Sequence, residues 1–343
     1  MISVLEYSKP SILLISRLPL HGAYLHKSLS KHYDVVWIGQ TFPFKITTLN
    51  VSYLLFREFC AMLVNFKRLR FSLIVIQFVS LDGIVAVLFK RIFRTKIVLF
   101  AVGSDILRIR EHASAYPIIK FIIAESDFVF CTSGFIQKKL KTMDFSASKM
   151  KVIPSVVDFD DFEAYHGPKI FDIVNVGALD SNKNQMLLIK ACESLPSVKV
   201  LIVGDGPLRG VLESESVKRH LDLVFLGEIP RKQVFRELQK SRIYVHTSKN
   251  EGLPVAVLEA MFLSLPVILV ERPYVYDIEH RYGFKVHVVR DNSIEDLANT
   301  LREVLQNYEI EHRRATTNKH KIQDLISESS NEIRERLDKF VVT

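Results

Sequence analysis

Short apolar runs alternate with helical patterns along nearly the whole chain, and this alternation limits the possible folds more than any other feature. The runs have the length and composition of buried strands. They lie at residues 11–16, 34–39, 73–78, 96–101, 127–132, 171–177, 199–203, 223–227, 242–246, 267–270 and 285–289. Strand–helix alternation of this kind is typical of parallel, doubly wound sheets. We therefore predict an α/β fold.

A connection near residue 160 divides this pattern into two halves. The chain has 343 residues, which is enough for two domains of ordinary size. Between Lys151 and Phe162, Pro154 and a group of aspartates suit an exposed connection. We therefore place one domain at residues 1–160 and a second at 161–320, followed by a C-terminal helix at 321–343.

The stretch from His246 to Val270 carries two carboxylates, Glu251 and Glu259, within a strand–loop–helix–strand pattern. Open α/β sheets bind ligands at the carboxyl ends of their strands, where Glu251 is expected. The free N–H groups of the helix that starts after Pro254 favour an anion such as a phosphate. Carboxylates accept hydrogen bonds from hydroxyls, so this pair suits a sugar or a ribose beside a phosphate.

The segment EGLPVAVLEAM, from Glu251 to Met261, resembles the E-x7-E signature of retaining glycosyltransferases, specifically the group 1 enzymes of family 4. Other segments are similar to further motifs of this family: GSD at 103–105, GDGPLR at 204–209 and KVIPSVVDFDDF at 151–162. The resemblance implies the GT-B architecture, in which two Rossmann-like domains face each other across a cleft. The first domain then binds the acceptor and the second binds the nucleotide sugar, while the C-terminal helix crosses back to the first domain.

The resemblance also assigns roles to residues of the second half. Glu259 is expected to hold the nucleotide ribose, Glu251 the donor sugar, and Lys183 the donor diphosphate. The loop and helix start that follow Glu251 are expected to contact the donor phosphates through Gly252, Leu253, Pro254 and Val255. Stabilising the charge of the leaving diphosphate is the main electrostatic task of such a site.

Two glycine-containing turns complete the expected nucleotide pocket. The turn after the strand at 199–203 is expected to line it through Gly204, Gly206 and Arg209, and the backbone at Gly227 and Ile229 to contact the base. One departure is notable, because Ala178 stands where the family has an arginine. Its charge would then have to come from Arg209 or Arg231.

In the first half, Asp105 is the strongest polar candidate. It belongs to the GSD motif, which in the family lies on the acceptor side of the cleft, so the resemblance implies a catalytic role. The alternative is that Ser104 or Asp105 simply caps a helix. Val102 stands where many members have a histidine. We also expect Gly22 to make a sharp strand-to-helix turn, near the donor phosphates in the family.

The resemblance implies an enzyme that moves a sugar, of the hexosyl class, from a nucleotide-diphosphate sugar to a hydroxyl acceptor with retention of anomeric configuration. Synthesis of a cell-envelope polysaccharide or glycolipid is the expected setting. No D-x-D metal motif follows a strand, since Asp158-Phe159-Asp160 lies in the connection, so we expect no metal and no other cofactor. The alternative is a degenerate member that binds a nucleotide or a partner without turnover.

Charge is unevenly distributed along the chain. Residues 1–151 contain 21 Lys or Arg and 9 Asp or Glu, whereas residues 152–343 contain 25 and 29. The basic and apolar segment Lys90–Lys96 suits the anionic face of a membrane, or else is a solvated helix end. No nucleic-acid-binding motif is present. The three cysteines have no metal spacing. We expect neither a leader in residues 1–9 nor a membrane span at 71–89, and hence a cytoplasmic location, with peripheral contact at the inner membrane face.

Overall fold

The structure is a computed structural model that describes residues 9–16, 18–39, 48–80, 83–107, 116–160, 162–195, 197–290 and 293–341. Its contacts divide the chain into two compact units. The first comprises residues 1–157 and 327–343, and the second comprises residues 158–326. The long helix α13 (Tyr308–Val341) contributes residues to both units.

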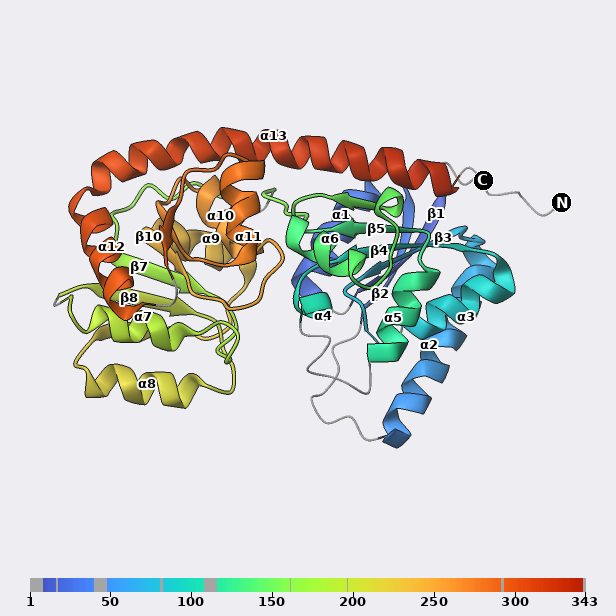
Figure 1. The fold of residues 1–343 in the computed structure, drawn as a ribbon, viewed down its shortest axis with the longest axis horizontal. Coiled ribbons are helices and arrows are strands. Elements are labelled where there is room, and N and C mark those ends of the chain that lie inside the picture. The colour runs from blue at the N-terminus through green and yellow to red at the C-terminus, as the bar shows by residue number, and fades with distance from the viewer. Residues whose placement is uncertain are drawn as a thin grey trace. The chain divides into compact units, whose positions relative to one another are not determined.

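The first unit is a six-stranded parallel sheet with helices on both faces (Figure 1). The strand order is β2-β1-β3-β4-β5-β6. The strands are β1 (Ser11–Ser16), β2 (Asp34–Gly39), β3 (Leu73–Gln77), β4 (Lys96–Ala101), β5 (Phe128–Cys131) and β6 (Met150–Val152). The helices before residue 157 are α1 (Pro19–Ser30), α2 (Thr48–Leu69), α3 (Gly83–Phe93), α4 (Ser104–Leu107), α5 (Tyr116–Glu125) and α6 (Gly134–Lys141).

Alternating residues of the central strands serve two separate hydrophobic cores. In β1, Leu13 belongs to the core under α2, α3 and α5, whereas Ile12 and Leu14 belong to the core on the opposite face. The second core also takes Ile333 and Leu337 from the end of α13. Because both faces are covered, the central strands are largely apolar, as the doubly wound prediction requires.

The second unit repeats this plan with the strand order β12-β11-β10-β7-β8-β9. Its strands are β7 (Phe171–Val176), β8 (Lys199–Val203), β9 (Asp222–Phe225), β10 (Ser241–His246), β11 (Val267–Val270) and β12 (His287–Val289). Its helices before α13 are α7 (Gln185–Cys192), α8 (Arg209–Lys218), α9 (Arg231–Gln239), α10 (Val255–Phe262), α11 (Pro273–Tyr276) and α12 (Ile294–Gln306). Both sheets are parallel, so the predicted α/β fold is confirmed.

The expected turn at Gly22 is wrong, because α1 begins at Pro19 and Gly22 lies inside the helix. Proline at the first helical position supplies a suitable φ angle and needs no N–H partner. A Cβ atom on Gly22 would come within 2.7 Å of Ser16 Oγ and of Trp37 Cζ2. The glycine therefore allows α1 to pack closely on the sheet.

The basic segment 90–96 carries less free charge than its sequence indicates. Lys90 Nζ lies 2.8 Å and Lys96 Nζ 3.6 Å from the Asp127 carboxylate, and Arg91 pairs with Glu125 at 2.5 Å. Burying Lys90 beside Asp127 ties the end of α3 to the start of β5. Within the residues that the structure describes, no helix is both long enough and apolar enough to cross a membrane.

Candidate active site

The polar residues of the second unit gather where two parallel strands end. Strand β7 leads into the loop 177–184, and β10 leads into the loop 247–254. Thr247 Oγ1 donates to the Lys183 carbonyl at 2.7 Å, and the Lys249 N–H donates to the Asn182 carbonyl at 2.8 Å. The Asn182 side chain in turn binds the backbone of Asn250. These bonds hold the two loops together, although 68 residues separate Asn182 from Asn250.

Lys183 and Glu251 form the centre of this cluster. Lys183 Nζ lies 2.5 Å from Glu251 Oε1, and the two side chains are 25% and 17% exposed. The loop that presents Lys183 is an Asx turn, in which Asp180 accepts hydrogen bonds from the N–H groups of Asn182 and Lys183. Two residues predicted to bind different parts of a donor therefore contact each other directly.

Glu259 lies in the second turn of α10 and is paired with a residue of another helix. Its carboxylate Oε1 is 2.6 Å from Arg231 Nη1, and its side chain is 3% exposed. The Arg231 guanidinium also lies 4.6 Å from the centre of the Phe235 ring. Burial raises the pKa of the Glu259 carboxyl to about 7, and the Arg231 charge opposes this shift only in part.

This raised pKa predicts a pH dependence of stability. The folded protein binds a proton at Glu259 more tightly than the unfolded chain does, so ionising Glu259 costs folding free energy. The contribution of Glu259 to the free energy of unfolding therefore falls as pH rises from the ordinary glutamate pKa of 4.5 to about 7. Above that pH the contribution is constant. The full cost is about 3 kcal/mol. We expect the stability of Glu259→Gln relative to wild type to increase by about this amount between pH 4.5 and pH 8, as measured by chemical denaturation. A constant difference would contradict the assignment.

The glycine-rich turn after β8 packs against the loop that follows β7. The Gly204 N–H donates to the Gly227 carbonyl at 2.8 Å, and the Leu179 N–H donates to the Asp205 carbonyl at 2.9 Å. The Gly206 N–H donates to the side chain of Asp205 at 2.7 Å. The predicted nucleotide-binding glycines 204, 206 and 227 thus lie together beside the loop that carries Lys183.

Gly204 is required by its backbone and its surroundings. Its φ is +133°, and a Cβ atom there would meet the Gly177 carbonyl oxygen. We expect Gly204→Ala to destabilise the protein by more than about 1 kcal/mol. A Cβ atom added to Gly210, inside α8, would have no neighbouring atom within 4 Å. The matched change Gly210→Ala is therefore expected to stabilise by about 0.5–1 kcal/mol. Thermal unfolding of the two variants tests this contrast, and equal melting temperatures would refute it.

Neither arginine proposed to replace the missing charge at Ala178 is a separate cation. Arg209 lies 2.9 Å from Asp205 and 2.8 Å from Glu213, in a well-exposed cluster. Arg231 pairs with Glu259. The positive charge of each guanidinium is therefore balanced by a carboxylate of the protein itself.

The helix start after Glu251 has the predicted form. Pro254 precedes α10 and provides no side-chain cap for its first N–H groups. Gly252, Leu253, Pro254 and Val255 are buried. A small anion or a phosphate suits the uncapped N–H groups of this helix.

Asp105 lies in the first unit, and its carboxylate accepts hydrogen bonds from backbone N–H groups. It accepts hydrogen bonds from the N–H groups of Val79, Val102 and Gly103, at 3.0, 3.4 and 2.7 Å, and it is 4% exposed. Burial raises its pKa, and the backbone bonds oppose that shift. These bonds join the segments that follow β3 and β4 and are not those of a helix cap, while the catalytic role stays a prediction.

The sequence did not predict three polar residues near the candidate site of the second unit. Tyr244 and His246 are fully buried in β10, and Tyr274 is buried in α11. The available signal was the alternation in β10, where Ile243 and Val245 are apolar while Tyr244 and His246 are polar. Buried polar side chains on one face of a strand need partners there.

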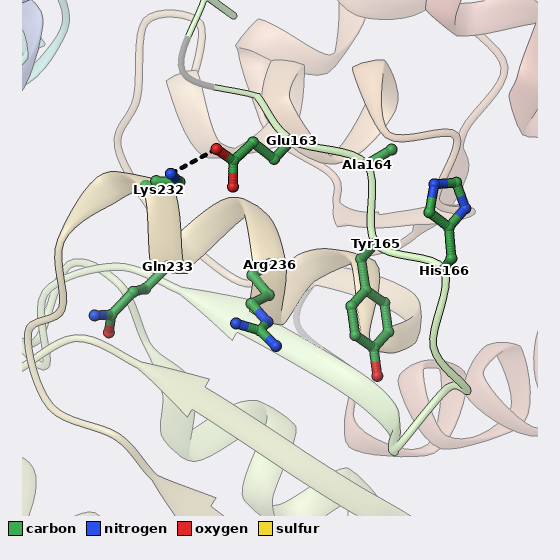
Figure 2. Close-up of a pocket in the computed structure, with 7 residues that line it drawn as sticks. All are labelled: Glu163, Ala164, Tyr165, His166, Lys232, Gln233 and Arg236. Atoms are coloured by element: carbon green, nitrogen blue, oxygen red, sulfur yellow. Dashed lines mark ion pairs between the residues drawn. The ribbon is translucent and has the colours of Figure 1, made fainter.

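A pocket of about 250 Å³ lies elsewhere in the second unit (Figure 2). It is lined by Glu163, Ala164, Tyr165, His166, Lys232, Gln233 and Arg236. Figure 2 shows these side chains on α9 and on the segment that precedes β7, with Lys232 paired to Glu163. None of the predicted site residues lines it. Among the described residues, no group of three or more His, Cys, Asp or Glu side chains has the arrangement of a metal site.

Relatives by sequence match about half of the chain. Residues 158–322 match the family described as glycosyl transferases group 1. An uncharacterized glycosyltransferase, MJ1059, from Methanocaldococcus jannaschii is 28% identical over 208 residues, which are 53% of this chain and 50% of that protein. The amylovoran biosynthesis glycosyltransferase AmsK from Erwinia amylovora is 28% identical over 199 residues, 52% of this chain and 48% of that protein. The chain therefore spans about half the length of these relatives.

Solved structures match nearly the whole chain. Sucrose-phosphate synthase from Thermosynechococcus elongatus has a TM-score of 0.80 at 16% identity and covers 96% of this chain and 99% of its own. HepE from Anabaena, in complex with UDP and glucose, has a TM-score of 0.76 at 17% identity and covers 96% and 100%. At such identities the likeness concerns the fold alone. Residues 158–322 of this chain are therefore similar to the group 1 glycosyl transferases, and the chain as a whole has the GT-B fold.

Proposed function

We propose that the protein transfers a sugar from a nucleotide-diphosphate sugar to a hydroxyl acceptor. The observation that carries this proposal is the pair of contacts Lys183–Glu251 and Arg231–Glu259 at the ends of the strands of a group 1 domain. A cation beside a carboxylate suits a diphosphate next to a sugar hydroxyl, and the deeper carboxylate suits a ribose.

Uridine diphosphate (UDP) is the nucleotide that we propose first for the donor. The structural neighbour HepE binds UDP and glucose, and TarM from S. aureus was solved with UDP. We also propose that transfer retains the anomeric configuration, needs no metal ion and serves the synthesis of a polysaccharide or glycolipid. Identical initial rates with and without EDTA would support metal independence, and the anomer of the product, read by NMR, would decide retention.

An anionic membrane is the proposed surface at which the acceptor is presented. Leu88 and Ile92 of α3 are 50% and 53% exposed, and Phe121 of α5 is 37% exposed with Arg91 over its ring. Exposed apolar side chains beside cations suit the interface of an anionic bilayer. The ion pairs of Lys90, Arg91 and Lys96 lower the charge of this face, so apolar insertion would carry more of the binding than the sequence indicates.

Thermal shift with UDP, GDP and ADP tests the donor site. We expect one nucleotide to raise the melting temperature of the wild type, and Glu259→Gln to lose this increase because a neutral amide is a weaker acceptor for ribose hydroxyls. Glu215→Gln is the matched control, since Glu215 lies on α8 and pairs with Lys218 and Arg219. An increase that persists in Glu259→Gln would contradict the ribose assignment, and no increase with any nucleotide would contradict donor binding.

A specific observation favours the alternative of binding without turnover. Ala178 removes one cation, and Arg209 and Arg231 are both engaged by carboxylates. Release of sugar from the donor that binds would exclude this alternative. Binding without any transfer or donor hydrolysis would establish it.

A further inference from the structure

Two buried polar side chains of β10 point away from the hydrophobic core that covers one face of the sheet. Ile243 and Val245 pack into the hydrophobic core on one face of the sheet. Because side chains alternate along a strand, Tyr244 and His246 point to the other face. There Tyr244 Oη lies 3.1 Å from His246 Nδ1. The tyrosine is completely buried and the histidine is 2% exposed.

The other ring nitrogen of His246 faces the candidate sugar site. His246 Nε2 lies 4.0 Å from Glu251 Oε1, beyond hydrogen-bond distance. Among the described residues it has no hydrogen-bond partner, although it is buried. A buried polar atom without a partner costs free energy. The nearby carboxylate oxygen is meanwhile held by Lys183 at 2.5 Å.

The surroundings select one tautomer of this histidine. Burial and the Lys183 charge lower the pKa of His246 well below its usual range, so the ring is neutral and carries a single proton. Burial raises the pKa of Tyr244, so its hydroxyl keeps its proton and can either donate to Nδ1 or accept from it. The Glu251 carboxylate 4.0 Å from Nε2 favours a proton on Nε2, and hence donation by the tyrosine. The imidazole proton then lies on Nε2, where it faces a carboxylate instead of presenting a lone pair to it.

We propose that His246 is a positioning residue for Glu251, whose carboxylate passes from Lys183 to the Nε2–H of His246 when a donor diphosphate binds. The proposal rests on the proposed function, because a diphosphate must draw Lys183 away. A carboxylate that is 17% exposed then needs a new donor. A rotation that brings Glu251 about 1 Å closer forms a hydrogen bond of ordinary length. The cation thus moves to the leaving group while Glu251 stays directed at the sugar.

The first test uses no nucleotide. In protein labelled with ¹⁵N-histidine, the His246 signals are assigned by their loss in His246→Gln. We expect a neutral ring protonated on Nε2 at pH 7. Lys183→Met imitates departure of the lysine, so the Nε2 proton should shift downfield, and Lys183→Met/Glu251→Ala should reverse this. Lys190→Met, at an exposed position of α7, is the matched control. A proton on Nδ1, or an unchanged Nε2 proton in Lys183→Met, would overturn the proposal.

The second test adds UDP to the wild type. The same downfield shift is expected on saturation with UDP, and a Tyr244→Phe variant should show a mixture of tautomers, because Nδ1 has lost its donor. Binding of UDP without a shift of the Nε2 proton would overturn the exchange. If UDP does not bind, the proposed nucleotide fails, and the Lys183→Met comparison still decides the role of His246.

Discussion

Replacing Lys183 with methionine is expected to lower the rate of sugar transfer by about 10²–10³-fold, the usual effect of removing one group that stabilises developing charge. The methionine keeps most of the aliphatic side chain and removes the cation that lies 2.5 Å from Glu251. Because the charge of the diphosphate is largest in the transition state, the loss should appear in kcat rather than only in KM. Steady-state release of nucleotide from the donor that binds measures it.

The control for this prediction is Lys190→Met, which removes an exposed cation of α7. Its rate should equal that of the wild type. The double variant Lys183→Met/Glu251→Gln should lose less than the product of the two single losses, because residues in contact are not independent. A Lys183→Met enzyme with undiminished kcat would show that the diphosphate is stabilised by other groups.

Replacing Arg231 with methionine is expected to cost about 3–5 kcal/mol of stability at pH 8, because a buried carboxylate is left without its cation. Glu259 is 3% exposed on its side chain, so water does not replace the guanidinium. The cost should be smaller at pH 5, where Glu259, whose pKa is about 7, takes up a proton and becomes neutral. Thermal unfolding at the two pH values measures both effects.

Arg314→Met is the control for the second change. Arg314 pairs with Glu311 on α13 but is 60% exposed, and exposed ion pairs contribute about 0–1 kcal/mol. Its melting temperature should change little at either pH. Should Arg231→Met unfold at the wild-type temperature at pH 8, the ion pair would contribute nothing to stability.

The local sequence pattern predicts a strand or helix correctly where the residues of that element alone determine its structure. The sequence predicts a strand at Lys199–Val203, and β8 is found there, because an apolar run bounded by turn residues is a local signal. Helix ends are less secure. Val257, Met261 and Leu265 recur every four residues, which is typical of one continuous helix. In the structure α10 ends at Phe262, and Leu265 lies beyond it. Its side chain is buried all the same, so periodicity indicates burial and not helix length.

The sequence pattern does not predict which residues far apart along the chain contact each other. Lys90 and Lys96 belong to a segment whose composition indicates a basic surface, yet both reach Asp127, more than 30 residues away. The sequence around Gly22 indicates a turn, yet this glycine accommodates Trp37 and Ser16. In both cases a residue's partner comes from another strand or helix, and no spacing along the chain indicates it.

By itself, the sequence determined the α/β class and the two sheets, because strand periodicity is local. It predicted the candidate residues Lys183, Glu251 and Glu259 through the resemblance of short segments to family motifs. Only the tertiary structure decided which charges meet. It pairs Lys183 with Glu251 and Arg231 with Glu259, and it sets His246 behind Glu251. The physical reason is that electrostatic energy and burial depend on distance in space, and the sheet brings together loops that the chain keeps far apart.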